Sequence, residues 1–351
     1  MILTQHILEC AGSVLSGENL ITHGSILANS PGESKKNVRH AKERYSSPFR
    51  LQARYISGRM QGPSQYCLDM ITTEYPYGEE FPIIRIETAL CSAEVSLYGA
   101  HLIHWTPAGQ MPVIFMSPKA EFRKGKALRG GVPLCWPWFG KHPEDAAQPS
   151  HGVARISTWQ LAASEELEDG CVRLMLALPP AQEMLPSGAV MMEIGSELTI
   201  SLITLDVPRT MPFSAAMHTY FAVSDYEKVA ITGLEDSAFT EYADDAVPHC
   251  EDPLIPAGHI DRIYCPVQEN QEIAIHDPGW SRSIRICRAG SGSCVVWNPG
   301  ETLAAGMGDL GAEAARGFLA VESSVVPAEN IMLRCGETHE LTTNIRVVPI
   351  D

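Results

Sequence analysis

The 351-residue sequence has no long apolar run and no basic leader at its start. No stretch approaches the roughly 18 apolar residues that a membrane-spanning helix requires. The opening residues, MILTQHILECAGSVL, are apolar in patches but lack the positively charged region of a secretory signal. These absences argue against a membrane protein and a secreted one, so we expect a cytoplasmic protein.

Clustered cysteines are also missing. The ten cysteines are scattered along the chain, and no two of them form a CxxC pair. A zinc cluster or a disulfide framework needs closer or more regular spacing. Most lie in apolar, strand-like surroundings, such as Cys171 beside Val172 and Cys287 beside Ile286. A reduced cysteine in such surroundings behaves as a small hydrophobic side chain. We therefore expect free, structural thiols.

Motifs for nucleotides, nucleophilic serines and metals are absent as well. The chain contains no Walker sequence, no GxGxxG and no GxSxG. His101 and His104 are three residues apart, and on a strand that spacing points their side chains to opposite faces. We therefore expect that the protein needs neither a metal nor a cofactor.

Negative charge dominates the chain, whose formal net charge is −16. Residues 1–70 hold eight Lys/Arg and five Asp/Glu, whereas the remaining 281 residues hold 18 basic and 37 acidic side chains. A body this acidic repels nucleic acid and anionic membranes, so we expect neither as a partner. Any anion that binds must be held by a local cluster of basic residues.

Residues 1–70 differ from the rest in composition. They contain the basic polar stretch GESKKNVRHAKER and show no sustained apolar periodicity. Such a segment is typically disordered or loosely attached. It is either a functional tail or the result of a misassigned translation start, with Met70 as the true initiator. We expect residues 71–351 to form the folded domain.

From about residue 83 onward, short strand patterns recur between turns rich in Gly and Pro. Apolar and polar residues alternate in Ile84–Glu87 and Leu198–Leu202, as in half-buried strands. Further candidate strands are Val172–Leu178, Ser283–Cys287, Cys294–Trp297 and Phe318–Val321. Helical periodicity is scarce, and the best short helix candidate is Pro118–Phe122. Many closely spaced strands predict an all-β sandwich or barrel with few short helices.

An arginine beside two glycines marks the first candidate site segment, Lys126–Lys141. Gly130 and Gly131 allow the backbone and the Arg129 guanidinium to approach a ligand together. The Trp-Pro-Trp-Phe run that follows offers the flat apolar surface typical of sugar sites. The alternative is a core corner packed with aromatic side chains.

A second arginine lies in Ser150–Arg155. The sequence predicts a turn at His151-Gly152 and places Arg155 at the start of a strand. Arg129 and Arg155 could fork together onto a phosphate, a geometry in which arginine outperforms lysine. The alternative is two unrelated surface arginines.

Three more titratable residues are candidates. His218, in the apolar strand MHTYF, has the unperturbed pKa of a proton carrier at neutral pH, although many such histidines are core residues. Glu322 ends the apolar run FLAVE, where a carboxylate is costly to bury unless it is paired or used; alternatively it reaches water. Asp261, in HIDRIY, could pair with Arg262.

Taken in order, these segments resemble the glucose-6-phosphate 1-epimerase branch of the aldose 1-epimerase, or galactose mutarotase-like, family. The resemblance covers roughly three quarters of the chain, from about residue 83 to the end. RGGVP followed by HGVAR is its most specific signature, and the other matching segments are MHTYF, HIDRIY, VVWNP, FLAVES and the GE of CGETH. It implies a large antiparallel β-supersandwich and a cofactor-free reaction that opens and recloses a sugar ring.

The resemblance also implies residue roles. His218 and Glu322 match the family's catalytic pair, with Glu322 as base and His218 as acid. Relatives often carry glutamine where this chain has Ser150, so a direct substrate contact there changes. The expected substrate-binding residues are Arg129, Arg155, Asp261, Ser150 and His151.

The expected partner is a hexose 6-phosphate, and we expect a monomer. Two other functions stay open. One is a non-catalytic carbohydrate-binding or regulatory protein, which would need neither His218 nor Glu322. The other is an aldose 1-epimerase for unphosphorylated sugars, which would not need both Arg129 and Arg155.

Overall fold

The computed structural model describes residues 70–179, 185–248 and 250–350. Over these residues the strands form sheets of ten, seven, four and two strands, and every strand pair is antiparallel. The predicted N-terminal extension lies outside the described residues except for Met70. It therefore remains a prediction.

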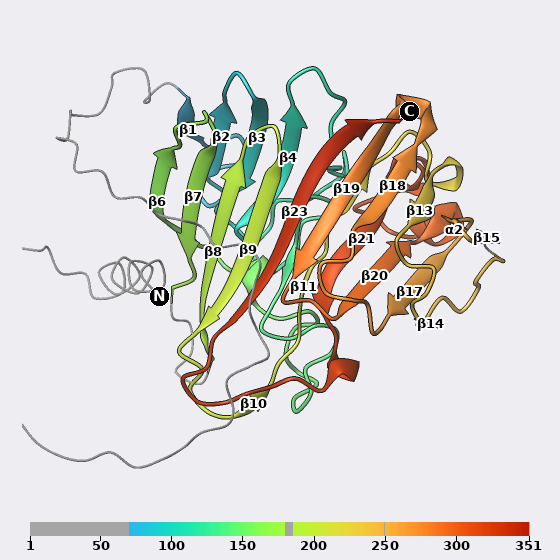
Figure 1. The fold of residues 1–351 in the computed structure, drawn as a ribbon. Helices are drawn as coiled ribbons and strands as arrows, with labels where there is room; N and C mark the ends of the chain where they lie inside the picture. Colours follow the sequence, from blue (N-terminus) through green and yellow to red (C-terminus); the bar gives the residue numbers. More distant parts are fainter. Residues whose placement is uncertain (1–69, 180–184, 249, 351) are drawn as a thin grey trace, which may run out of the picture.

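The ten-stranded sheet runs across the front of Figure 1. In spatial order its strands are β15 (Cys250–Glu251), β16 (Leu254–Ile255), β13 (Ala230–Thr232), β18 (Ile273–Asp277), β19 (Arg282–Ala289), β23 (His339–Pro349), β9 (Leu198–Leu205), β8 (Ser187–Ile194), β7 (Val172–Ala177) and β6 (Gln160–Glu166).

Behind it lie the other two large sheets (Figure 1). The four-stranded sheet consists, in order, of β1 (Ile71–Glu74), β2 (Ile83–Glu87), β3 (Cys91–Ser96) and β4 (His101–Pro107). The seven-stranded sheet has the order β14 (Phe239–Glu241), β17 (Ile260–Tyr264), β20 (Ser293–Asn298), β21 (Phe318–Val325), β11 (Ala215–Met217) and β5 (Leu134–Cys135), and β12 (Tyr220–Ala222) also pairs with β21. The strands β10 (Met211–Pro212) and β22 (Met332–Leu333) form a separate small pair.

One hydrophobic core joins the three large sheets. It includes Ile84 of β2, Leu174 of β7, Ile284 of β19 and Leu319 of β21, each at most 1% exposed. The ten-stranded sheet thus packs face to face on the other two sheets, as in a sandwich. The predicted all-β supersandwich is confirmed, and the six predicted strands coincide with β2, β7, β9, β19, β20 and β21.

Helices are few and short in the described part of the chain. They are α2 (Gly300–Ala305), α3 (Ala312–Ala315) and the single-turn 3-10 helices η2 (Ala154–Ile156), η3 (Tyr226–Lys228), η4 (Pro278–Trp280) and η5 (Pro327–Glu329). No described helix is long and apolar enough to cross a membrane.

The helix expected at Pro118–Phe122 is wrong, because the structure has a turn and irregular backbone there. The Ser117 hydroxyl accepts a hydrogen bond from the Lys119 amide at 3.1 Å and donates one to the Asp309 carbonyl at 2.6 Å. Such side-chain bonds to the backbone compete with helix formation. A run this short also cannot offset the cost of helix nucleation.

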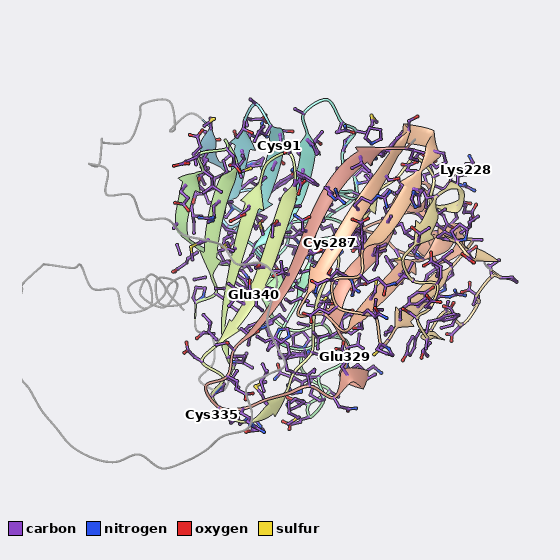
Figure 2. The ribbon with its side chains drawn as sticks, viewed as in Figure 1. Cys91, Lys228, Cys287, Glu329, Cys335 and Glu340 are labelled. Atoms are coloured by element: carbon purple, nitrogen blue, oxygen red, sulfur yellow. The ribbon has the colours of Figure 1, made fainter. Side chains whose placement is uncertain are left out.

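Where the structure describes their side chains, the cysteines are free thiols, as expected. Cys91, Cys135 and Cys294 are buried, whereas Cys335 is exposed. Figure 2 shows Cys91, Cys287 and Cys335 in widely separated parts of the fold.

The predicted Gly130-Gly131 segment lies against β4. Both glycines have positive φ, +104° and +68°, a conformation that L side chains rarely adopt. A Cβ atom on Gly131 would overlap Nε2 of His101, which bonds the Gly130 carbonyl at 2.8 Å. One on Gly130 would lie 2.6 Å from the Phe115 carbonyl oxygen. Glycine therefore lets the chain carrying Arg129 pass directly over β4.

We predict that Gly131→Ala lowers the free energy of unfolding by roughly 1–3 kcal/mol more than Gly109→Ala, because only the first adds overpacking. Gly109 is the matched control, since it has φ +74° and open space around the added Cβ. Urea denaturation of both variants measures the difference. Equal losses would show that the positive φ alone accounts for the effect.

Candidate active site

Glu322 lies on the outward face of the seven-stranded sheet. Along β21, Leu319, Val321 and Val325 point into the core that faces the ten-stranded sheet. Since successive side chains of a strand alternate, Phe318 and Glu322 point to the other face. The predicted alternative, a strand-end glutamate that reaches water, is therefore wrong, because the Glu322 side chain is only 2% exposed.

His218 directly follows β11, the neighbour of β21. The pairing of Met217 with Ser323 brings the two strands into register, and the His218 amide donates to the Pro133 carbonyl at 3.0 Å. These constraints place Nε2 of His218 3.2 Å from Oε1 of Glu322. The structure thus brings the two expected catalytic residues into direct contact.

Burial opposes charge on both members of this pair. It raises the pKa of Glu322 well above its usual range, and the negative charge of Asp261 adds to that shift, while Arg155 opposes it. Burial also lowers the pKa of His218; repulsion from His151 when it is protonated, and from the positive charges of Arg155 and Arg129, lowers it further. In the free protein the pair therefore favours its neutral forms, with one proton between the carboxyl and the imidazole.

Each member of the pair also keeps one buried polar atom without a hydrogen-bond partner among the described residues. These atoms are Oε2 of Glu322 and Nδ1 of His218. Unsatisfied buried polar atoms are costly and call for an explanation. A ligand that hydrogen-bonds here would supply one.

Aromatic side chains surround His218. The Tyr220 ring stacks on the imidazole with centroids 4.8 Å apart and planes 12° from parallel. Trp297 of β20 meets the imidazole edge-on at 5.7 Å. The Tyr220 ring contacts Trp297 and Phe318 in turn. The imidazole is therefore held in one orientation by packing.

Arg129 reaches this aromatic group from the Gly130-Gly131 segment. Its Nη1 donates to the Tyr220 hydroxyl at 3.1 Å, and its Nε donates to Oδ1 of Asp309 at 3.4 Å. Oδ2 of Asp309 also lies 3.6 Å from Nζ of Lys126. A cluster of two cations and one carboxylate thus lies beside the His218–Glu322 pair.

Arg155 lies in η2, so its expected place at the start of a strand is wrong. The Trp136 carbonyl accepts bonds from the Val153 and Ala154 amides, which turns the chain into a 3-10 helix. Nη2 of Arg155 donates to the Ser150 carbonyl at 2.8 Å. Its charge influences the pKa values of both His218 and Glu322, so Arg155 and Arg129 act on the same pair.

Ser150 and His151 form the turn before η2. The His151 amide donates to the Gly140 carbonyl at 2.6 Å, and the Gly140 amide donates to His151 Nδ1 at 3.3 Å. Burial and then the charge of Arg155 lower the pKa of His151 to about 4. The Ser150 hydroxyl donates to the Gly140 carbonyl at 3.3 Å. Neutral His151 therefore holds the turn together at physiological pH.

Asp261 lies on β17 and faces the same side as Glu322. It pairs with Trp297 of β20, whereas Glu322 pairs with Val295, two residues away along β20. Two strand spacings and this two-residue offset put the Cα atoms of the two acids about 12 Å apart. Burial raises the pKa of Asp261. Arg262 points to the other face, where it donates to Glu241 at 2.7 Å.

Tyr220, Trp297 and Asp309 also belong to this site, although none of them is among the residues predicted from the sequence. Tyr220 and Trp297 lie inside the segments MHTYF and VVWNP, three and two residues after their respective starts, and alternation along the strands could have placed them beside His218. Asp309 had no such signal, since it is 180 residues from Arg129. No described group of His, Cys, Asp and Glu side chains could hold a metal ion.

An antiparallel β-sandwich that presents a buried carboxyl–imidazole pair beside arginines suits proton transfer to and from a polar ligand. The profile of the aldose 1-epimerase family matches residues 82–346, and the chain belongs to this family. It is therefore an epimerase, an isomerase that interconverts sugar anomers.

Named relatives agree with this assignment. An Escherichia coli K12 protein called "Putative glucose-6-phosphate 1-epimerase" is 32% identical over 277 residues, which are 77% of this chain and 91% of that one. A Cenchrus ciliaris protein of the same name is 29% identical, over 78% of this chain and 86% of its own.

Solved structures show the same fold. The crystal structure of a "putative mutarotase (YeaD)" from Salmonella typhimurium is similar with a TM-score of 0.71 and 27% identity, over 80% of this chain and 94% of its own. A galactose mutarotase-like protein from Lactobacillus casei matches with a TM-score of 0.56 and 17% identity, over 76% of this chain and its full length. The galactose mutarotase-like fold is thus confirmed.

Because Glu322 is buried, we predict that the Glu322→Gln variant is more stable than wild type, by an amount that grows with pH. Below about pH 4.5 the glutamate is protonated in both the folded and the unfolded chain, so the two proteins should be equally stable. As the pH rises toward the raised folded pKa, only the unfolded chain ionises, which destabilises the wild type by about 1.4 kcal/mol per unit of pKa difference. The variant should therefore become the more stable protein above about pH 5.

Urea denaturation at pH 4 to 8 measures this difference. The lowered pKa of His218 costs stability below pH 6.5 in both proteins, so it largely cancels. The control is Glu168→Gln at an exposed glutamate, which should stay within about 0.5 kcal/mol of wild type. A stability difference for Glu322→Gln that does not grow with pH would contradict the assignment of a raised pKa.

Proposed function

We propose that this protein interconverts the α and β anomers of a hexose 6-phosphate, with glucose 6-phosphate as the first choice. The observation that carries the proposal is the contact of His218 with Glu322 beside two arginines. The relatives named after glucose-6-phosphate 1-epimerase support the phosphorylated substrate. So does the acidic body, which needs local cations to hold an anion.

Anomer interconversion requires that the cyclic hemiacetal open and reclose on the other face of C1. One group takes the proton of the C1 hydroxyl while another gives a proton to the ring oxygen, and the bond between C1 and the ring oxygen breaks. The open aldehyde then rotates about the C1–C2 bond, and the proton transfers run in reverse. A pair that holds one proton provides an acceptor and a donor at the same time.

Glu322 is the proposed base and His218 the proposed acid. The free protein disfavours the imidazolium that this assignment requires, partly because Arg129 and Arg155 lower the pKa of His218. A bound phosphate offsets those positive charges. Substrate binding therefore shifts the shared proton from Glu322 toward His218 and prepares the pair for ring opening.

Arg129 and Arg155 are the proposed phosphate ligands. A guanidinium presents its N–H groups in a planar fork that matches a phosphate. Asp261, Ser150 and His151 are the proposed contacts to the sugar and its phosphate. Asp261 shares a face of the sheet with Glu322, whereas Ser150 and His151 precede Arg155 in the same turn.

We predict that His218→Ala and Glu322→Gln each lower kcat for glucose 6-phosphate by about 10²–10⁴-fold, the usual contribution of general acid–base catalysis. NMR exchange between the anomeric protons measures the rate after subtraction of the uncatalysed reaction. The matched controls are His104→Ala, a half-buried histidine of β4, and Glu168→Gln. Near-wild-type turnover in either site variant would refute its proposed role.

Arg129→Ala and Arg155→Ala should each raise KM for glucose 6-phosphate by roughly 10- to 100-fold, the worth of a hydrogen bond to a charged group. KM for unphosphorylated glucose should change little, because glucose has no phosphate group for the arginines to bind. Arg85→Ala on β2 controls for the loss of one positive charge. Equal losses on both sugars would show that the arginines are structural.

The same assay separates the proposal from its two alternatives. A protein that only binds carbohydrate would leave the anomers of both sugars at the uncatalysed rate. An aldose 1-epimerase for free sugars would accelerate glucose at least as well as glucose 6-phosphate. The proposal requires a clear preference of wild type for the phosphorylated sugar.

A further inference from the structure

Tyr220 contacts both His218, a member of the proposed catalytic pair, and Arg129, a proposed phosphate ligand. The side chain belongs to β12 and is only 2% exposed. Its ring stacks on the His218 imidazole, while its hydroxyl accepts a hydrogen bond from Nη1 of Arg129 at 3.1 Å. One rigid side chain thus touches both the proposed acid and a proposed phosphate ligand.

The contacts of Arg129 define how its guanidinium is oriented. A guanidinium carries five N–H donors in a planar fork. Asp309 accepts from Nε, and Tyr220 accepts from one N–H of Nη1. The donors beyond these two bonds all lie on the Nη ends of the fork. Because Nε and Nη1 are both anchored, the plane of the guanidinium is fixed, and one N–H of Nη1 and both N–H groups of Nη2 are left for a ligand.

Packing restricts the Tyr220 ring in the same way. Phe318 contacts it with centroids 5.1 Å apart, and Trp297 contacts it at 6.0 Å. Trp297 also meets His218 at 5.7 Å. Because the three rings hold one another, a shift of the Tyr220 ring would move the imidazole that stacks on it.

We propose that Tyr220 is a positioning residue with two separable functions, and this inference rests on the proposed function. Its hydroxyl orients Arg129 toward the phosphate of the substrate, and its ring orients His218 toward the ring oxygen of the sugar. Tyr220 itself transfers no proton. Burial raises the pKa of its phenol, so the hydroxyl keeps its proton at neutral pH.

Tyr220→Phe removes the hydroxyl and keeps the ring. We expect KM for glucose 6-phosphate to rise roughly 10-fold, because Arg129 loses one of its two anchors, while kcat falls less than about 3-fold. The inhibition constant of inorganic phosphate, used as a competitive probe, should rise by the same factor. KM for glucose should change less than about 3-fold.

Tyr220→Leu also removes the ring. We expect kcat to fall about 10-fold or more on both sugars, because small misplacements of a catalytic group are costly to the rate. Tyr226→Phe is the matched control, since Tyr226 is 1% exposed and its hydroxyl bonds the Gly258 carbonyl at 2.9 Å. This control should leave both KM for glucose 6-phosphate and the phosphate inhibition constant near wild type.

The outcomes distinguish the inference from the function on which it rests. If wild type does not accelerate the anomerisation of glucose 6-phosphate, the proposed function fails and the inference fails with it. If wild type is active but Tyr220→Phe changes neither KM nor the phosphate inhibition constant, the inference alone is overturned. An equal loss on both sugars in Tyr220→Phe also overturns it, because a merely structural role would produce that pattern.

Discussion

The contact between Glu322 and His218 is held at a depth where neither group is easily charged. A carboxyl group at 2% exposure is costly in its ionised form, and the imidazole beside it cannot readily become an imidazolium among the positive charges of Arg129 and Arg155. Burial therefore favours the neutral form of both groups in the free protein. Under the proposed function, the arginines that oppose a charged imidazole in the free protein would become compatible with it once the phosphate of the substrate neutralises them. The burial of the pair, its protonation state and the nearby cations therefore depend on one another.

The β-sandwich provides the rigidity that this arrangement needs. One side of β21 packs Leu319 and Val321 into the shared core, so the strand cannot rotate or slide without breaking that core. The opposite side of the same strand carries Glu322. A residue that is energetically unfavourable is thereby supported by apolar burial on the far face of its own strand. The aromatic rings of Tyr220 and Trp297 then pack against the imidazole and restrict its rotation.

The turns that carry the cations depend on backbone conformations that side chains would prevent. Gly130 and Gly131 allow the chain before β5 to lie directly over His101, and Gly152, at φ +75°, lies so close to the Trp136 backbone that a Cβ there would overlap it. Arg129 and Arg155 leave these two turns from different parts of the sequence. Their convergence on His218 therefore follows from backbone packing. A chain with a net charge of −16 thus places two cations near enough to His218 to lower its pKa.

Much of the fold was predictable, because strand alternation is a local property with a period of two residues. The strands around Ile84 and Leu198 follow from that pattern alone. The short helix expected at residues 118–122 was wrong because Ser117 bonds the backbone of a segment distant in sequence. For the site, the residues alone predicted a functional role for Glu322 but left His218 as a candidate core residue. Only the family resemblance predicted that the two form a catalytic pair.

By itself, the sequence determined the fold class, the sheet faces and the residue types able to transfer protons or bind an anion. Only the tertiary structure decided which of them meet. The register of β11 against β21 puts His218 on Glu322, and the packing of α2 and α3 behind the site puts Asp309 on Arg129, 180 residues away. Strand register and loop packing depend on contacts distant in sequence, and no local pattern encodes those. The shifted pKa values also depend on the tertiary structure, because burial and the neighbouring charges exist only once the chain has folded.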